Sequence, residues 1–342
     1  MPVQWEGFFG NAAVAKALAE AIERGKIPQT LLFSGPAGVG KATLARRLAA
    51  RLLGDPAGRI ECDDLSLEAN AGRIDEREKW PPDKRKDNPL VFASHPDFLT
   101  FAPDGPLRQI TIEQMRLLKD RAALKPLRGA WRVFLIDSID RANEQAANSL
   151  LKTLEEPPPH LILILTARNA YDLIPTIRSR AVPFHFARLA DEQMRPFLAT
   201  RQVDDPERRL QLAEGSPGMA VSMDLEAYDR RREAMLALLK TASGLETFAG
   251  WMKYSEAIAA RRTEKLDWYL EALYSLIGDV VRLGHGMPEV RNRDIRGEIE
   301  ALARKVSFAW LQKMVERVDE LVELARRNIQ KTIALDALAV DR

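Results

Sequence analysis

The sequence predicts an α/β fold, a parallel sheet with helices on both faces, followed by a region that is all helical. Two observations predict this order. Short apolar runs alternate with helical segments as far as Phe186, and only helical patterns follow it. A glycine-rich loop joins the first apolar run to a helix, which is the strand–loop–helix context that a phosphate-binding loop requires.

Five short runs are predicted to be strands, and several lack polar alternation, as expected for strands buried on both faces. They are TLLFS at 30–34, DFLTFA at 97–102, RVFLID at 132–137, LILILT at 161–166 and VPFHF at 182–186. Apolar residues at helical spacing predict helices at 11–24, 41–53, 112–123 and 143–156. The prolines Pro157–Pro159 end the last of these helices.

Residues 54–94 interrupt the alternation with a charged segment that is rich in proline and glycine, with EREKWPPDKRKDNP at its centre. We expect a poorly ordered or loosely packed insertion on the surface. Its lysines and arginines suggest a nucleic-acid patch, but interleaved acidic residues favour a solvated loop.

The second half of the chain predicts a helical bundle. Helical patterns run over 192–212, 224–239, 245–261, 265–282 and 307–328. We therefore expect three domains. They are a nucleotide-fold domain at 1–188, a small helical lid domain at 189–223 and a helical collar for oligomerisation at 224–342.

Composition sets limits on the class of protein. The chain has 342 residues, a net charge of +2 and one cysteine, Cys62. One cysteine excludes a disulfide within the chain and a cysteine zinc cluster, so we expect no zinc. No run of about 18 apolar residues predicts a membrane span, and no secretory signal is recognisable. We therefore expect a cytoplasmic protein.

The loop GPAGVGKAT at 35–43 carries the clearest chemical signal. Such a loop points backbone N–H groups at phosphate oxygens from the N-terminus of a helix. Gly35, Gly38 and Gly40 let the chain turn and the phosphate approach, and Lys41 would reach the terminal phosphates.

Two positions lack the groups that support hydrolysis. Ala42 stands where a hydroxyl normally coordinates Mg²⁺, and Thr43 points about 100° further round the helix. Asp137 ends an apolar strand and fits the carboxylate that holds magnesium. Ser138 follows it where a water-orienting carboxylate is usual, and Asp140 is either its replacement or a helix cap. The residues predict a weak or vestigial site, at which binding of ATP or ADP stays open.

Two arginines, Arg178 and Arg180, precede the last predicted strand. An arginine can stabilise the charge on a phosphoryl group in the active site of a neighbouring protein. The alternative is a surface arginine in an ion pair, and the spacing alone favours that alternative.

Several motifs together resemble the clamp-loader branch of the AAA+ ATPases. The most specific is ANSLLKTLEEPP at 147–158, within a longer similar run at 132–180. Further similar segments are SHPDFL at 94–99, QITIEQMR at 109–116, GSPGMA at 215–220 and RRNIQKTIALDAL at 326–338. The resemblance covers most of the chain except residues 54–94.

The resemblance implies a place in an open ring of five subunits that uses ATP to load a sliding clamp on primed DNA. It implies as partners the tau/gamma and delta subunits, the clamp and primer–template DNA. One member of the ring is a scaffold that does not hydrolyse ATP and gives the arginine of its S-R-C motif to the next subunit. Here the motif reads Ser179, Arg180, Ala181, which implies that Arg180 acts on a neighbouring ATP site.

The chain also departs from the family pattern. Many relatives carry a four-cysteine zinc module where this chain has only Cys62, and many active relatives carry an arginine where Pro217 and Gly218 stand. Two rival functions stay open. One is an ATP-hydrolysing tau/gamma-type subunit, and the other is a stand-alone P-loop kinase with a small-molecule acceptor.

Overall fold

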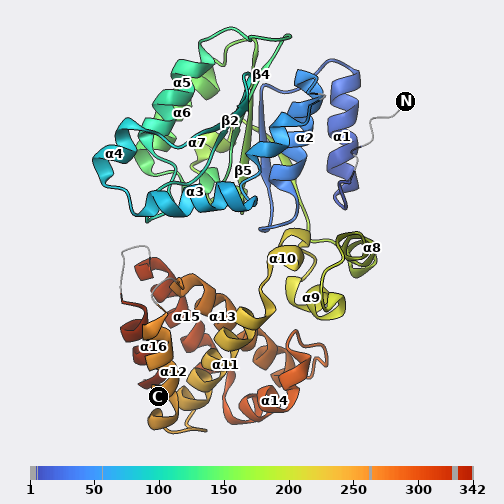
Figure 1. Cartoon of the computed structure of the whole chain (residues 1–342). Helices are drawn as coiled ribbons and strands as arrows, with labels where there is room; N and C mark the ends of the chain where they lie inside the picture. The colour runs from blue at the N-terminus through green and yellow to red at the C-terminus, as the bar shows by residue number, and fades with distance from the viewer. Residues whose placement is uncertain (1–4, 6, 56, 262–263, 326–329, 341–342) are drawn as a thin grey trace. The chain divides into compact units, whose positions relative to one another are not determined.

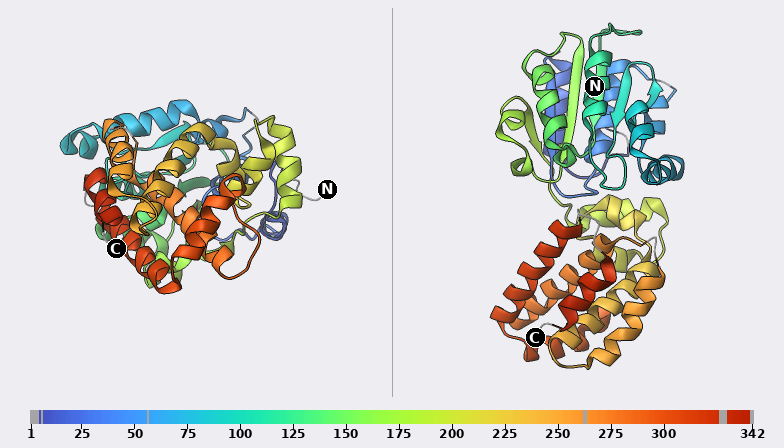
Figure 2. Two further views of the ribbon diagram at one scale, coloured as in Figure 1. Left: turned by 90° about the horizontal axis from the view of Figure 1, so that it is seen from below. Right: turned by 90° about the vertical axis from the view of Figure 1, so that its left-hand side faces the viewer.

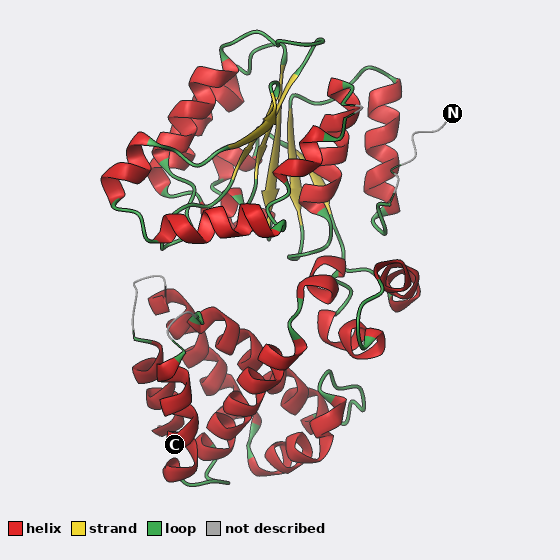
Figure 3. Ribbon diagram, in the orientation of Figure 1, coloured by secondary structure: helices red, strands yellow, loops and turns green. Residues whose placement is uncertain are grey.

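The computed structural model describes residues 5, 7–55, 57–261, 264–325 and 330–340. The chain forms two compact units, which are described separately. The first comprises Met1–Pro206 and Ala213–Val221, and the second comprises Glu207–Leu212 and Ser222–Arg342. Among the described residues, strands occur only in the first unit, and the second consists of helices and loops (Figures 1 and 3). The predicted three-domain division stays a prediction.

One six-stranded sheet forms the centre of the first unit, in the order β2-β3-β4-β5-β1-β6. Its strands are β1 (Thr30–Ser34), β2 (Phe92–His95), β3 (Phe98–Phe101), β4 (Arg132–Ile136), β5 (Leu161–Ala167) and β6 (Val182–His185). The five predicted strands are confirmed. β2 was not predicted, and it pairs antiparallel to β3, so the sheet is mixed rather than parallel. Only two residues separate β2 from β3, too few for the crossover that a parallel pair needs.

Helices cover both faces of the sheet, as predicted (Figures 1 and 2). One face packs against α1 (Ala12–Glu23) and α2 (Lys41–Leu53) through residues such as Leu31 and Leu135. The other face packs against α5 (Ile112–Ala122), α6 (Glu144–Glu155) and α7 (Pro175–Arg178), beside the short turns η2 (Ile139–Arg141) and η3 (Ala170–Asp172). Strands buried on both faces explain the continuous apolar runs in the sequence.

The described part of segment 54–94 is folded, so the expectation of a poorly ordered insertion was wrong. It forms η1 (Arg59–Asp63), α3 (Glu68–Glu78), α4 (Pro82–Asp87) and the edge strand β2. A buried ion pair anchors it, because Arg77 donates to Asp104 through Nε at 2.9 Å and through a terminal nitrogen at 2.6 Å. A small apolar cluster that includes Ile74 and Leu90 adds to this anchor. The segment is so rich in charged residues that its few, widely spaced core residues were not recognised in the sequence.

The predicted helix at 192–212 is two helices, α8 (Asp191–Arg201) and α9 (Pro206–Ala213). Gln202 adopts a left-handed conformation that ends α8, and Pro206 begins α9. α10 (Pro217–Ser222) follows.

The helices of the second unit surround one apolar core that includes Trp251, Tyr269 and Leu273. They are α11 (Leu225–Ala242), α12 (Phe248–Ala260), α13 (Leu266–Gly284), η4 (Arg293–Ile295), α14 (Arg296–Lys305), α15 (Phe308–Ala325) and α16 (Lys331–Val340). The sequence did not predict α14 or α16. The part of the predicted helix at 326–328 lies outside the described residues. Within the described part of the chain, no helix combines the length and apolar character needed to cross a bilayer.

Candidate functional site: the phosphate loop and Arg180

The predicted phosphate loop follows β1 and opens α2. Gly35, Gly38 and Gly40 have φ angles of 149°, 73° and 94°, a region that side chains rarely adopt. A Cβ atom at Gly35 would lie 2.2 Å from the carbonyl oxygen of Phe186. Glycine is therefore required both for the backbone turn and for the close packing of this loop.

Lys41 binds its own loop. Its Nζ donates to the carbonyl oxygens of Gly35 and Pro36, both at 2.6 Å. Burial lowers the pKa of Lys41 from 10.5 to about 8, against the opposing fields of Asp137 and Asp140. The ammonium group thus binds two carbonyl acceptors of the loop, and a phosphate would have to take their place.

A hydroxyl of β5 connects the predicted magnesium ligand to the residue after it. The hydroxyl of Thr166 donates to the carboxylate of Asp137, and the oxygen of that hydroxyl accepts from the N–H of Ser138 at 2.8 Å. Burial raises the pKa of Asp137, although the Thr166 hydrogen bond and Lys41 oppose the rise. Ser138 has a φ of 63°, which is costly for a serine, so Thr166 secures a strained backbone.

α10 packs against the loop from a distant part of the sequence. The Ser216 hydroxyl donates to the Ala37 carbonyl at 2.7 Å, and the Gly218 N–H donates to the Gly38 carbonyl at 2.8 Å. A Cβ at Gly218 would lie 2.9 Å from the Cα of Gly38, and one at Gly38 would lie 2.3 Å from Ser216 Oγ. This pair of glycines therefore allows direct backbone contact between α10 and the loop.

The residues present fit a phosphate group but not magnesium-assisted hydrolysis. The N-terminus of α2 and the Lys41 ammonium would hold phosphate oxygens. Ala42 offers no metal ligand, and the Ser138 position offers no carboxylate for a water molecule. Asp140 lies in η2 and does not cap α6, because the Asn143 side chain accepts from the N–H of Ala146 at 2.8 Å.

The structure brings Lys41 and Asp137 into one electrostatic environment, but it places Arg180 elsewhere. Arg180 follows α7, which lies on the sheet face opposite α2. Its guanidinium donates to the Thr176 carbonyl at 2.9 Å and forms a 2.8 Å ion pair with Glu155 at the end of α6. The Arg180 side chain is 34% exposed. It is thus a surface group outside the nucleotide loop of its own chain.

Sequence reasoning missed Thr166, Ser216 and the close contact made by Gly218. Thr166 ends a predicted strand, but nothing in the sequence showed that this strand lies beside the one before Asp137. The presence of glycine rather than arginine at 218 was recognised, whereas its packing against Gly38 required tertiary structure.

Further candidates do not add chemistry to this site. In the described ranges, no group of three or more histidine, cysteine, aspartate or glutamate side chains could hold a metal ion, and Cys62 is exposed. The expectation of no zinc stays a prediction.

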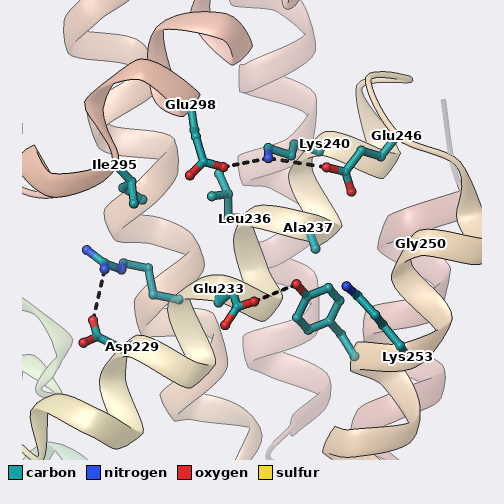
Figure 4. Close-up of a pocket in the computed structure, with 12 residues that line it drawn as sticks. Asp229, Glu233, Leu236, Ala237, Lys240, Glu246, Gly250, Lys253, Ile295 and Glu298 are labelled. Carbon is teal, nitrogen blue, oxygen red and sulfur yellow. Dashed lines mark hydrogen bonds and ion pairs between the residues drawn. The ribbon is translucent and has the colours of Figure 1, made fainter.

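A separate cavity of about 510 Å³ lies among α11, α12 and α14 of the helical unit (Figure 4). Its charged groups pair with one another. Lys240 binds Glu298 at 2.7 Å and Glu246 at 3.4 Å, and the Tyr254 hydroxyl donates to Glu233 at 2.8 Å. Several polar groups that line the cavity therefore bind one another.

Comparisons with known proteins agree with the resemblance. A family model described as DNA polymerase III, delta subunit, matches residues 82–190. The DNA polymerase III subunit gamma/tau of Mycobacterium tuberculosis is 34% identical over 205 residues, which are 58% of this chain but only 31% of that protein. The DNA polymerase III subunit delta′ of Pseudomonas aeruginosa is 28% identical over 326 residues, 90% of each protein. A gamma subunit-related protein of Thermotoga maritima, whose structure is solved, is 20% identical with a TM-score of 0.43, covering 94% of this chain and 96% of that one.

The sheet with helices on both faces and its phosphate loop give the chain the strand–loop–helix geometry of a P-loop protein. The family model and the delta′ relative make the chain similar to delta-type subunits of DNA polymerase III. The gamma/tau matches fit the other subunit type, but delta′ is the better match because it covers more of both proteins.

Proposed function

We propose that the chain is the scaffold subunit of a clamp loader, with no ATP hydrolysis of its own, and that it lends Arg180 to the ATP site of a neighbouring subunit. In this role it assembles with tau/gamma and delta subunits and helps place the sliding clamp on primer–template DNA. The assembly, the clamp, the DNA and the role of Arg180 are proposed from the resemblance to the family, and the surface position of Arg180 agrees with that role.

The nucleotide loop supports the first half of this proposal. Lys41 is bound to loop carbonyls, Ala42 lacks a hydroxyl, and Thr166 occupies the Asp137 carboxylate. ADP or ATP binding at this loop would be weak, because phosphate oxygens must displace the hydrogen bonds of Lys41.

The position of Arg180 is the observation that carries the second half. The guanidinium lies at the surface, on the sheet face opposite the helix that Lys41 begins. It cannot serve the phosphate site of its own chain from there, yet it contacts Thr176, Glu155 and, at 3.4 Å, the Ser179 hydroxyl. An ordered, exposed arginine fits a phosphoryl group presented by another protein.

The direct test is Arg180→Ala in the complete loader, reconstituted with clamp and primed DNA. Single-turnover hydrolysis at the neighbouring site is expected to fall by roughly 10³-fold, the lower end for arginines of this kind. Arg178→Ala is the matched control, because Arg178 lies two residues earlier and stacks on Tyr171. Native mass must show that every variant assembles. Unchanged hydrolysis with Arg180→Ala would refute the trans-acting role.

The tau/gamma type is the second candidate, because those relatives are the more identical over the shared region. It predicts steady phosphate release from the purified single chain in the presence of Mg²⁺. The scaffold proposal predicts no phosphate release above background. Lys41→Ala would then leave the measured rate of phosphate release unchanged.

A further inference from the structure

Glu155 is the last residue of α6 and the charged partner of Arg180. Its Oε1 lies 2.8 Å from a terminal nitrogen of the guanidinium, while the other terminal nitrogen donates to the Thr176 carbonyl at 2.9 Å. Two acceptors, one on α6 and one on α7, thus bind one planar group, although the Glu155 side chain is 48% exposed. Rotation of the Arg180 side chain would break both interactions.

The location of Glu155 is unfavourable unless a cation accompanies it. The C-terminus of a helix carries partial negative charge, so a carboxylate in the last turn is repelled. Glu156 and then Pro157 and Pro158 follow, and the prolines prevent the helix from continuing. Lys152 already places one positive charge in the last turn of α6, and Arg180 adds a second one that pairs directly with Glu155.

The pairing leaves part of the guanidinium available. Arginine has five N–H donors in a rigid fork, and Glu155 and Thr176 engage the two terminal nitrogens from within the chain. With 34% of its side chain exposed, Arg180 still presents donors to the outside. A long side chain that is already fixed loses less freedom when it meets a phosphate than a mobile one does.

We propose that Glu155 is a positioning residue that fixes Arg180 in the orientation in which it meets the phosphates of a neighbouring subunit. This inference rests on the proposed function, because it assigns a support to the same trans-acting arginine. Glu155 touches no phosphate itself and acts only through Arg180.

The test compares Glu155→Ala, Glu155→Gln and Arg180→Ala in the reconstituted loader. We expect Glu155→Ala to lower kcat at the neighbouring site about tenfold with the KM for ATP unchanged, because misplacement of a catalytic group affects mainly the transition state. Glu155→Gln keeps an acceptor of the same shape and is expected to restore part of the loss. The double variant Glu155→Ala/Arg180→Ala should be no slower than Arg180→Ala alone.

Glu156→Ala is the matched control, since it removes the adjacent exposed carboxylate at the same helix end. It should leave kcat within about twofold, the range typical of a neutral surface change. Urea unfolding of each variant checks that the subunit is intact, and Glu155→Gln replaces Glu155→Ala if the alanine variant does not assemble.

The outcomes separate the two proposals. If Arg180→Ala has no effect, the trans-acting role itself fails. If Arg180→Ala is slow but Glu155→Ala matches the Glu156→Ala control, only the positioning role of Glu155 is wrong. A rise in kcat with Glu155→Ala, or a loss that adds to that of Arg180→Ala, would also overturn the positioning role.

Discussion

The N–H of Gly218, at the start of α10, donates to the carbonyl oxygen of Gly38 in the phosphate loop at 2.8 Å. No side chain separates the two backbones, and a Cβ at residue 218 would lie 2.9 Å from the Cα of Gly38. The start of α10 thus contacts the phosphate loop directly through its backbone.

We therefore expect Gly218→Ala to destabilise the chain by about 1–3 kcal/mol, the range for overpacking a close contact. Backbone atoms cannot yield as a flexible side chain would. Gly297→Ala is a matched control, because Gly297 is also the second residue of a helix and has open space around it. It should be neutral or stabilising. Urea unfolding gives the change in stability for both variants. Equal changes would show that the close contact of Gly218 with the loop does not stabilise the chain.

Thr166→Val should lower the free energy of unfolding by about 1–3 kcal/mol, because the Ser138 N–H and the Asp137 carboxylate lose their shared partner in a region of low exposure. Thr166→Ser keeps the hydroxyl and should recover most of that loss. Chemical denaturation followed by circular dichroism gives both values. If valine and serine behave alike, the hydroxyl bridge does not stabilise the site.

Stability should depend on pH through Lys41. Its folded pKa of about 8 lies below the ordinary lysine pKa of 10.5, so the unfolded chain holds this proton more tightly. Burying the charged group is unfavourable below pH 8, and this penalty is relieved as pH rises from 8 to 10.5. The unfolding free energy of the natural chain should therefore rise relative to that of Lys41→Met as the pH increases across that window. A difference that is constant from pH 7 to 10.5 would show that Lys41 is not desolvated.

Arg77→Met should cost about 3–5 kcal/mol, because it leaves the buried carboxylate of Asp104 without its partner. Hydrogen exchange of α3 and α4 should rise at the same time, since Arg77 joins this segment to the rest of the unit. Lys79→Met, an exposed change on the same segment, should do neither. Protection of α3 that is unchanged in Arg77→Met would contradict this anchoring role.

Periodic patterns were sufficient for most elements of the fold. Apolar runs identified β1, β3, β4 and β5, because strands buried on both faces need apolar residues at nearly every position. The run at β6 was also recognised, although most of that edge strand is exposed. The edge strand β2 was missed, since FASH has two exposed positions and lies inside a charged segment. β2 runs antiparallel to β3 because only a short turn connects them, and no periodic pattern in the sequence indicates this direction.

At the candidate site, the sequence was sufficient to identify the chemical groups that are present and those that are lacking. It showed the glycines and Lys41 of the cradle, the lack of a hydroxyl at Ala42 and of a carboxylate at Ser138, and the presence of Arg180. These are properties of residue identity at fixed local spacing. They depend only on the chain near each residue.

The contacts between these groups became visible only in the folded structure. Thr166 reaches Asp137 because β5 lies beside β4, Gly218 touches Gly38 across 180 residues of chain, and Glu155 pairs with Arg180 between two helices. Such contacts join distant segments through backbone approach and side-chain direction, which no local pattern encodes. The contacts of the phosphate loop and of Arg180 therefore form only when the strands have paired in the sheet.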